Sequence, residues 1–320
     1  MTAQNLPRLL ITRCLPQKVL DAASLRFDVT LRDQDAPLSG ADLRAALRDY
    51  DAVLPTLGDV FSAQVFADTP HPRARILANF GVGYNHIDTA AARAAGVAVT
   101  NTPGAVTEAT ADIALTLMLM TARRAGEGER LVRSGAWQGW APTQMLGRSV
   151  FGASVAIIGM GRIGTAIARR CHFGFGMAVR YHSRSPRTLN FPAEAASLDR
   201  AMAADFVVLA VPGGAGTHHL IGAAQLAQMQ PSGILINISR GDVLDEVALA
   251  DALTTGRIAG AGLDVYAREP QITPALLALE NVTLLPHLGT AVLAVREAMG
   301  QMALDNLIAH FEGRALPNAV

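Results

Sequence analysis

Short apolar runs alternate along the chain with longer amphipathic segments. In the first third of the sequence, the runs rich in Val, Ile and Leu are residues 9–12, 27–31, 52–55, 75–79 and 97–101. Helical periodicity fills the gaps between them, as in residues 16–23 and residues 39–48. Buried strands that alternate with helices are typical of a parallel sheet covered by helices on both faces. The pattern therefore predicts an α/β fold.

Two of the expected helices have recognisable ends. Ser39 stands at the start of one, with Asp42 three residues later, which predicts a variant of the capping box. Residues 107–123 predict a longer helix, with Thr107 as its cap and basic residues at its end. Its stretch 113–120 is apolar nearly all round, which indicates a helix in a core or an interface. We expect this helix to connect two domains.

The same alternation begins again near Ser154 and continues to His287. The strands expected there are residues 155–160, 178–182, 206–212, 234–239, 262–265 and 282–286. Helices are expected between them, for example over residues 162–172 and 245–255. After His287 one helical stretch remains, residues 291–311, and it is too short to form a domain. The pattern predicts a second, six-stranded parallel sheet and a last helix that packs on the N-terminal domain.

Composition narrows the class of protein. The chain has 320 residues, a length that corresponds to about two domains. Half of the residues are hydrophobic and 17% are charged, which excludes a disordered chain. Twenty-seven basic residues match 27 acidic ones, so the sequence offers no basic surface for a nucleic acid or an anionic membrane. We expect neither kind of partner.

Cysteine usage and the first residues indicate the compartment. Cys14 and Cys171 are too few for a disulfide framework, which favours a reducing environment, and we expect both to be buried packing residues. No apolar run reaches the roughly 18 residues of a spanning helix. Residues 1–7 lack the basic and apolar segments of a secretion signal. The sequence predicts a cytoplasmic protein.

A glycine-rich turn follows the first strand of the second sheet and opens a helix. Its sequence is G-x-G-x-x-G, and the candidate cofactor-binding residues are Gly159, Gly161, Arg162, Ile163 and Gly164. The three glycines allow a tight turn, close approach of a pyrophosphate, and close packing of helix on strand. The helix N-terminus then offers N–H donors to the phosphates. The turn predicts a dinucleotide site.

The end of the next strand indicates which dinucleotide is bound. An NAD site places Asp or Glu about 20 residues after the turn, to hold the ribose 2′-hydroxyl. Residues 180–187 contain no carboxylate, whereas Ser183 and Arg184 supply the hydroxyl and the guanidinium that suit a 2′-phosphate. The alternative is a basic loop exposed to solvent. The sequence predicts NADP(H), with NAD(H) as the second choice.

Further motifs surround this turn. They are FGVGYNHID at residues 80–88, NTPG at 101–104, NISRGDVLDE at 237–246, AGLDVY at 261–266, EP at 269–270 and LPHLG at 285–289. Together they resemble the D-isomer-specific 2-hydroxyacid dehydrogenase family, nearest its glyoxylate/hydroxypyruvate reductases, over essentially the whole chain. The resemblance implies two doubly wound parallel-sheet domains. A Rossmann cofactor domain, residues 104–288, would be inserted into a flavodoxin-like substrate domain, residues 1–103 and 289–320.

Reduction of a 2-oxo acid requires three kinds of side chain, and this sequence has one candidate for each. A guanidinium grips carboxylate and carbonyl oxygens, which matches Arg240. An imidazolium donates the proton near neutral pH, which matches His287. A neighbouring carboxylate keeps that ring charged and oriented, which matches Glu269. By resemblance these three are the catalytic residues of the family, although a histidine after a strand is more often a packing residue.

The resemblance adds further site residues. It places substrate contacts at the backbone of Val82 and Gly83, and cofactor contacts at Pro212, Thr217, Ser239, Asp264 and Gly289. A plain turn remains open for the first pair, and a buried strand-end cap remains open for Asp264. The loop at residues 211–217 is richer in glycine than in the family and lacks the acidic residue usual before its threonine.

Two aromatic residues and two histidines are further candidates for contact with a partner subunit or a metal. Trp137 and Trp140 resemble a family loop that reaches a partner subunit, with packing inside the chain as the alternative, and we expect a homodimer. His218 and His219 have no metal-binding spacing around them, so we expect a solvated turn and no metal.

The expected function is the reduction of a small 2-oxo acid, glyoxylate or hydroxypyruvate, to the D-2-hydroxy acid by hydride transfer from NADPH. One alternative is a D-2-hydroxyacid dehydrogenase for a bulkier 2-oxo acid. Another, of a different class, is a nucleotide-sensing corepressor, since the C-terminal binding proteins share this fold and the same three residue types. Steady turnover separates the enzymes from the sensor.

Overall fold

The computed structural model describes residues 6–320, which form two compact units. Unit 1 comprises the chain up to Val106 together with Thr290–Val320, and unit 2 comprises Thr107–Gly289. The start of the chain, where the sequence predicts no secretion signal, lies in part outside the described residues. Each unit contains one parallel sheet covered by helices, which confirms the predicted α/β class.

The sheet of unit 1 has five parallel strands in the order β2-β1-β3-β4-β5. They are β1 (Arg8–Ile11), β2 (Asp28–Leu31), β3 (Ala52–Leu54), β4 (Ile76–Ala78) and β5 (Ala98–Thr100). All five were predicted, and their bounds differ from those of the apolar runs by at most one residue at either end. This strand order is the flavodoxin-like one.

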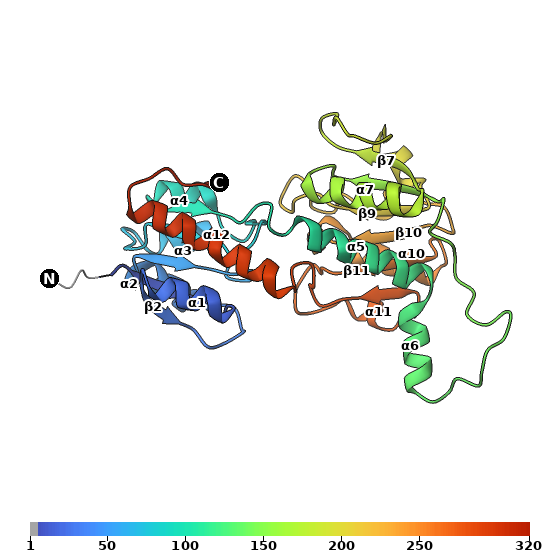
Figure 1. Ribbon diagram of the computed structural model, residues 1–320, viewed down its shortest axis with the longest axis horizontal. Helices are drawn as coiled ribbons and strands as arrows, with labels where there is room; N and C mark the ends of the chain where they lie inside the picture. The colour runs from blue at the N-terminus through green and yellow to red at the C-terminus, as the bar shows by residue number, and fades with distance from the viewer. Residues whose placement is uncertain (1–5) are drawn as a thin grey trace. The chain divides into compact units, whose positions relative to one another are not determined.

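The helices of unit 1 are α1 (Gln17–Ser24), α2 (Gly40–Asp49), α3 (Ala63–Ala67), α4 (Thr89–Ala94) and α12 (Leu293–Phe311). The capping box at the start of α2 is confirmed, because Ser39 and Asp42 bond each other's backbone N–H groups. Helix α12 packs on α1 and on β4, and its Leu304 and Leu307 belong to the same core as Leu9 of β1. The end of the chain therefore packs with this unit, although unit 2 separates the two segments in sequence (Figure 1).

The sheet of unit 2 has seven parallel strands in the order β12-β11-β10-β9-β6-β7-β8. They are β6 (Ser154–Ile158), β7 (Ala178–His182), β8 (Glu194–Ala195), β9 (Phe206–Leu209), β10 (Ile234–Asn237), β11 (Gly260–Leu263) and β12 (Val282–Leu284). The sequence predicted six strands. The seventh, β8, escaped prediction because it has two residues and no apolar run.

The helices of unit 2 are α5 (Thr107–Ala122), α6 (Ala125–Arg133), α7 (Arg162–Phe175), α8 (Leu198–Met202), α9 (Ala223–Leu226), α10 (Glu246–Thr254) and α11 (Pro274–Leu277), with a 3-10 turn at Gly241–Val243. Figure 1 shows α5 and α7 side by side on the sheet, where they contact each other. Leu117 and Met118 of α5 are fully buried, as its apolar sequence predicted. Thr107, predicted as the cap, is instead the first helical residue.

The two cysteines differ in their exposure to solvent. Cys171 of α7 is fully buried, and this burial raises the pKa of its thiol to about 12. The expectation of a buried Cys14 is wrong, because this residue lies exposed in the loop that leaves β1. None of the helices within residues 6–320 combines the length and the apolarity that crossing a membrane requires.

Candidate active site

Each catalytic candidate follows the carboxyl end of a strand in unit 2. Arg240 comes after β10, Glu269 comes after β11, and His287 comes after β12. These three strands are neighbours in a parallel sheet, so their carboxyl ends lie at one edge. Ligands of open α/β sheets bind at that edge. The fold therefore brings the three predicted residues to the edge at which sheets of this kind bind their ligands.

His287 and Glu269 form a hydrogen-bonded pair. The Nδ1 atom of His287 lies 2.8 Å from Oε2 of Glu269, and Oε1 of Glu269 accepts the N–H of Tyr266 at 3.0 Å. Burial by itself raises the pKa of Glu269. The bond from His287, its charge, the Tyr266 N–H and the charge of Arg240 outweigh that effect and hold the pKa below its ordinary value. The carboxyl is thus kept ionised beside the ring.

Arg240 is held by hydrogen bonds with Asn237 and Ser239. Nδ2 of Asn237 donates to the carbonyl oxygen of Arg240 at 3.0 Å, and Nη1 of Arg240 donates to the carbonyl of Ser239 at 2.7 Å. Burial lowers the pKa of the guanidinium, and the carboxylates of Glu269 and Asp242 oppose this shift. The arrangement gives a partly buried cation near the carboxylate that supports His287.

Gly241 brings the loops after β10 and β11 into backbone contact. A Cβ atom on Gly241 would overlap the carbonyl group of Tyr266. No other residue fits this position without moving one of the two loops. The contact fixes the distance between the segment that contains Arg240 and the segment that contains Glu269.

Asp264 holds the backbone at His287. The carboxylate is 1% exposed and accepts the N–H of Leu288 at 2.6 Å and that of Gly289 at 2.8 Å. These bonds accompany a left-handed backbone at His287, with φ of 54°, which a non-glycine residue adopts at a cost. Burial raises the pKa of Asp264, while the two N–H groups and the charge of His287 act to lower it.

Glu246 is a residue to which sequence reasoning gave no role. It is buried in the first turn of α10, where it accepts the N–H of Ala267 at 2.7 Å and the hydroxyl of Thr273. These two contacts lie on either side of Glu269. The available signal was a carboxylate inside a recognised motif, but its partners lie more than 20 residues away.

The glycine turn lies between β6 and the start of α7. Gly159 has φ of 104°, and a Cβ on Gly164 would overlap the carbonyl oxygen of Gly159. In the described chain, a Cβ on Gly161 would meet no heavy atom within 4 Å. There is open space in front of Gly161, at the N-terminus of α7, with Arg162 and Ile163 in its first turn. This cradle fits the pyrophosphate of a dinucleotide.

The loop after β7 contains the residues proposed for the 2′-phosphate. Ser183 donates its hydroxyl hydrogen to the carbonyl of Ser185 at 2.5 Å, and Arg184 is exposed. The carboxylate on the adjacent strand β8, Glu194, is paired with Arg180 at 3.2 Å and with Arg200 at 2.6 Å. A neighbouring acid is thus already neutralised, and the loop keeps its positive charge.

The hydroxyls proposed for cofactor contact are used within their own loops. Oγ1 of Thr217 donates to the carbonyl of Pro212 at 2.7 Å, and Oγ of Ser239 donates to Oδ1 of Asn237 at 2.8 Å. Because their hydrogens are already donated, these oxygens can offer a ligand only their lone pairs, as acceptors. Nearby, the rings of His218 and His219 stack with centroids 4.1 Å apart. No cluster suited to a metal ion occurs in residues 6–320.

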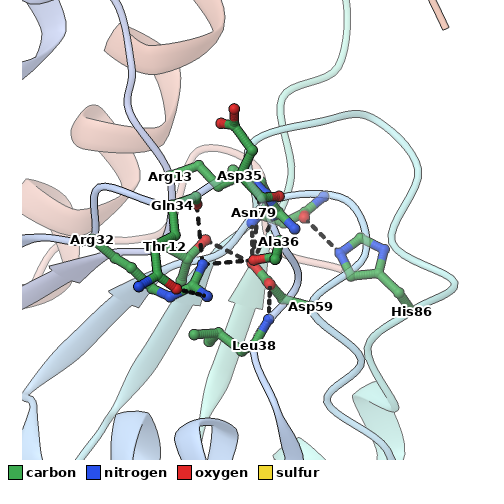
Figure 2. Close-up of polar contacts among 11 residues, drawn as sticks. Thr12, Arg13, Arg32, Gln34, Asp35, Ala36, Leu38, Asp59, Asn79 and His86 are labelled. Carbon is green, nitrogen blue, oxygen red and sulfur yellow. Dashed lines mark hydrogen bonds and ion pairs between the residues drawn. The ribbon is translucent and has the colours of Figure 1, made fainter. Parts of the chain in front are cut away.

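Unit 1 contains two polar networks at the carboxyl ends of its strands, and Figure 2 shows both. In one, the fully buried Asp59 accepts the hydroxyl of Thr12 at 2.6 Å, the N–H of Leu38 at 3.0 Å and an N–H of Arg13 at 3.2 Å. In the other, Oδ1 of Asn79 lies 3.0 Å from Nε2 of His86.

The backbone candidates Val82 and Gly83 lie in the loop that follows β4, four and five residues after its end. This loop is tied to the second network, because Nδ2 of Asn79 donates to the carbonyl oxygen of Gly83 at 3.0 Å. Sequence reasoning gave no role to Asn79.

Trp137 and Trp140 lie in the long loop that follows α6 in unit 2 (Figure 1). They are 51% and 82% exposed, and Nε1 of Trp137 lies 3.3 Å from Oε1 of Gln144. Packing inside the described chain therefore does not account for either ring.

The chain is similar in sequence to a family of known enzymes. Residues 115–289 match the family model described as D-isomer specific 2-hydroxyacid dehydrogenase, NAD binding domain. The glyoxylate reductase of Thermococcus gammatolerans is 42% identical, over 98% of this chain and 96% of that protein. The glyoxylate/hydroxypyruvate reductase B of Serratia proteamaculans is 38% identical, over 98% of this chain and 97% of that protein.

Solved structures show the same likeness. The NADPH-dependent glyoxylate/hydroxypyruvate reductase of Sinorhizobium meliloti, in complex with NADP and malonate, superposes with a TM-score of 0.87 at 37% sequence identity. The alignment covers 98% of this chain and 96% of that one. The matched segment 115–289 contains the glycine turn and all three catalytic candidates.

Proposed function

Because the chain belongs to the D-isomer-specific 2-hydroxyacid dehydrogenase family, we propose that it reduces glyoxylate or hydroxypyruvate with NADPH. The product is the 2-hydroxy acid, of D configuration where it is chiral. Membership makes the chain an NAD(P)-dependent dehydrogenase and confirms the family predicted from the sequence. The choice of substrate is supported by the relatives, which are named for these two activities.

One observation carries the proposed chemistry: His287 and Glu269 are bonded at 2.8 Å, at the sheet edge that Arg240 also occupies. A bound reduced nicotinamide supplies the hydride. His287 donates a proton to the carbonyl oxygen of the substrate and is left neutral. Glu269 fixes the ring through Nδ1, so that Nε2 faces the substrate, and it stabilises the imidazolium before transfer. Arg240 binds the carboxylate and the carbonyl oxygen.

We assign unit 2 to the cofactor and unit 1 to the substrate. The glycine turn, Ser183 and Arg184 supply the phosphate-binding groups of unit 2. Asp264 and Gly289 lie near the nicotinamide in this assignment, and Asp264 acts by holding the backbone of His287. Exposed Trp137 and Trp140 support the predicted homodimer, which sedimentation velocity tests. The cytoplasmic location stays a prediction.

The first experiment is a panel of 2-oxo acids assayed with NADPH and with NADH. We expect the highest kcat/KM for glyoxylate or hydroxypyruvate with NADPH. A bulkier 2-oxo acid as the best substrate would contradict the assignment of substrate. Saturable binding of nucleotide without turnover of any acid in the panel would favour the sensor.

Arg240→Ala tests the role of the guanidinium. We expect a loss of about 10²–10³-fold in kcat/KM, the effect of removing a charged donor from a water-poor site. Arg133→Ala, which removes an exposed arginine of α6 in the same unit, serves as the control and keeps wild-type kinetics. Near-normal activity of Arg240→Ala in a folded protein would show that the assignment is wrong.

Ser183→Asp tests the cofactor preference. The new carboxylate repels a 2′-phosphate and accepts from a 2′-hydroxyl, so the ratio of kcat/KM for NADPH over NADH falls by about tenfold or more. Ser183→Ala removes the hydroxyl without adding charge and shifts the ratio less. An unchanged ratio in Ser183→Asp would mean that another loop selects the cofactor.

A further inference from the structure

Two buried asparagines stand side by side at the carboxyl edge of unit 1. Asn79 is the first residue after β4 and Asn101 is the first after β5, and the last residues of these two strands are paired. Asn79 is 1% exposed and Asn101 is 8% exposed. Buried amides need partners for their hydrogens. Both asparagines find them in the same short loop.

The carbonyl oxygens of residues 81–83 are all bonded from within the unit. Nδ2 of Asn79 donates to the carbonyls of Gly81 and Gly83, each at 3.0 Å. Nδ2 of Asn101 donates to the carbonyl of Val82 at 2.7 Å. Three successive peptide groups are therefore oriented by two side chains.

This orientation decides where the peptide N–H groups of the loop point. In a planar trans peptide, the N–H points opposite to the carbonyl of the same plane. The N–H groups of Val82, Gly83 and Tyr84 therefore point away from the asparagines. Within residues 6–320, none of these three groups donates a backbone hydrogen bond. Successive N–H groups with a common exposed side bind anions.

His86 fixes which way the amide of Asn79 is turned. Both hydrogens of Nδ2 are used on carbonyl oxygens, so Oδ1 must be the acceptor for the contact with His86. Nε2 of His86, 3.0 Å from Oδ1, therefore bears a hydrogen (Figure 2). A reversed amide would place an oxygen against two carbonyl oxygens.

We propose that Asn79 and Asn101 are positioning residues that turn this loop into a receptor for the carboxylate of the substrate. The receptor uses three N–H donors, with Tyr84 as the third, and His86 keeps the amide of Asn79 in the required orientation. The proposal rests on the proposed function, because it takes the substrate to be a 2-oxo acid. It predicts selectivity for the anion over a neutral analogue.

The test compares Asn79→Ala and Asn101→Ala with the wild type, using glyoxylate and its neutral methyl ester. We expect the KM for glyoxylate to rise about tenfold, with kcat within about threefold and the KM for the ester unchanged. Thr69→Val is the control, because it removes a buried hydroxyl elsewhere in unit 1, bonded only to Val65. It keeps both KM values.

A second readout does not depend on turnover. Oxalate, titrated calorimetrically into the NADP-loaded enzyme, is expected to bind about tenfold more weakly to both alanine variants than to the wild type. If the wild type binds oxalate in this way but does not reduce glyoxylate, the proposed function fails while the receptor stands.

His86 supplies the matched pair of variants. His86→Gln keeps an N–H donor near the position of Nε2 and is expected to keep the wild-type KM, whereas His86→Leu raises the KM for glyoxylate. Equal changes of KM for glyoxylate and for the ester in the asparagine variants would overturn the proposal. So would an unchanged Kd for oxalate in variants that fold.

Discussion

Segments at the carboxyl edges of the two units are held by side chains of opposite polarity, as one comparison shows. In unit 2, Asp264 and Glu246 are carboxylates that accept backbone N–H groups from the segments near His287 and Glu269. In unit 1, the loop of residues 81–83 is held by amides that donate to its carbonyl oxygens. The holding group thus determines which backbone atoms remain for a ligand.

In the proposed function, this difference decides which groups each unit offers to an anion. Where carboxylates use up the N–H groups, as at Leu288 and Gly289, the segment has to present side chains, and unit 2 presents Arg240 and His287. Where amides use up the carbonyls, the backbone itself keeps its donors. A pair of asparagines can therefore replace a cation without placing a charge at the edge.

The largest effect is expected when the carboxylate of Asp264 is replaced by an amide, the group that holds the loop of unit 1. Asp264→Asn leaves one acceptor for two N–H groups and directs an NH₂ group at the other, so the left-handed backbone of His287 relaxes. We expect kcat to fall about 100-fold, which corresponds to about 2.7 kcal/mol and to the cost of an unsatisfied buried donor. Stopped-flow reduction with saturating NADPH measures it. Wild-type kcat would show that the backbone of His287 needs no such support.

A smaller effect is expected at Glu246. Glu246→Ala releases Ala267 and Thr273, which flank Glu269, and we expect kcat to fall about tenfold through looser support of His287. The KM for NADPH is expected to stay unchanged, because neither Ala267 nor Thr273 is assigned to the cofactor.

Glu246→Gln keeps one acceptor and restores most of the activity. Ser197→Ala removes the cap of the distant helix α8 and is the control for general destabilisation. A fall in stability with wild-type kcat would assign Glu246 a purely structural role.

The smallest effect concerns stability at low pH. The folded protein holds the pKa of Glu269 below its usual value of 4.5. The ionised carboxylate therefore stabilises the folded state fully above that pH, and this stabilisation is lost as pH falls through the folded pKa. In urea unfolding, the free energy of unfolding of the wild type is expected to exceed that of Glu269→Gln by less and less between pH 6 and pH 3. Asp51 and Asp205, whose pKa values are also lowered, affect both proteins alike. A difference in unfolding free energy that does not change with pH would contradict the expectation.

Local patterns predicted the architecture and the reacting groups better than they predicted what holds those groups. The strands were visible because each is a short apolar run, and the glycine turn because its spacing is fixed by geometry. The strand β8 has no such run. Contacts of Glu246 with Thr273, or of Asn79 with Gly83, join a side chain to a segment whose position depends on the finished fold, so no periodicity reveals them. Cys14 was mistaken for a core residue because residue type alone does not indicate exposure.

The backbone contact at Gly241 has a consequence for protein engineering. Since it leaves no space for a side chain against Tyr266, a saturation library at this codon should return glycine alone among active clones. Laboratory evolution toward larger keto acids cannot widen the gap between the guanidinium and the acid–imidazole pair from here. The exposed side chain of Leu57, in a loop of the other unit, is a position where substitution meets no such overlap.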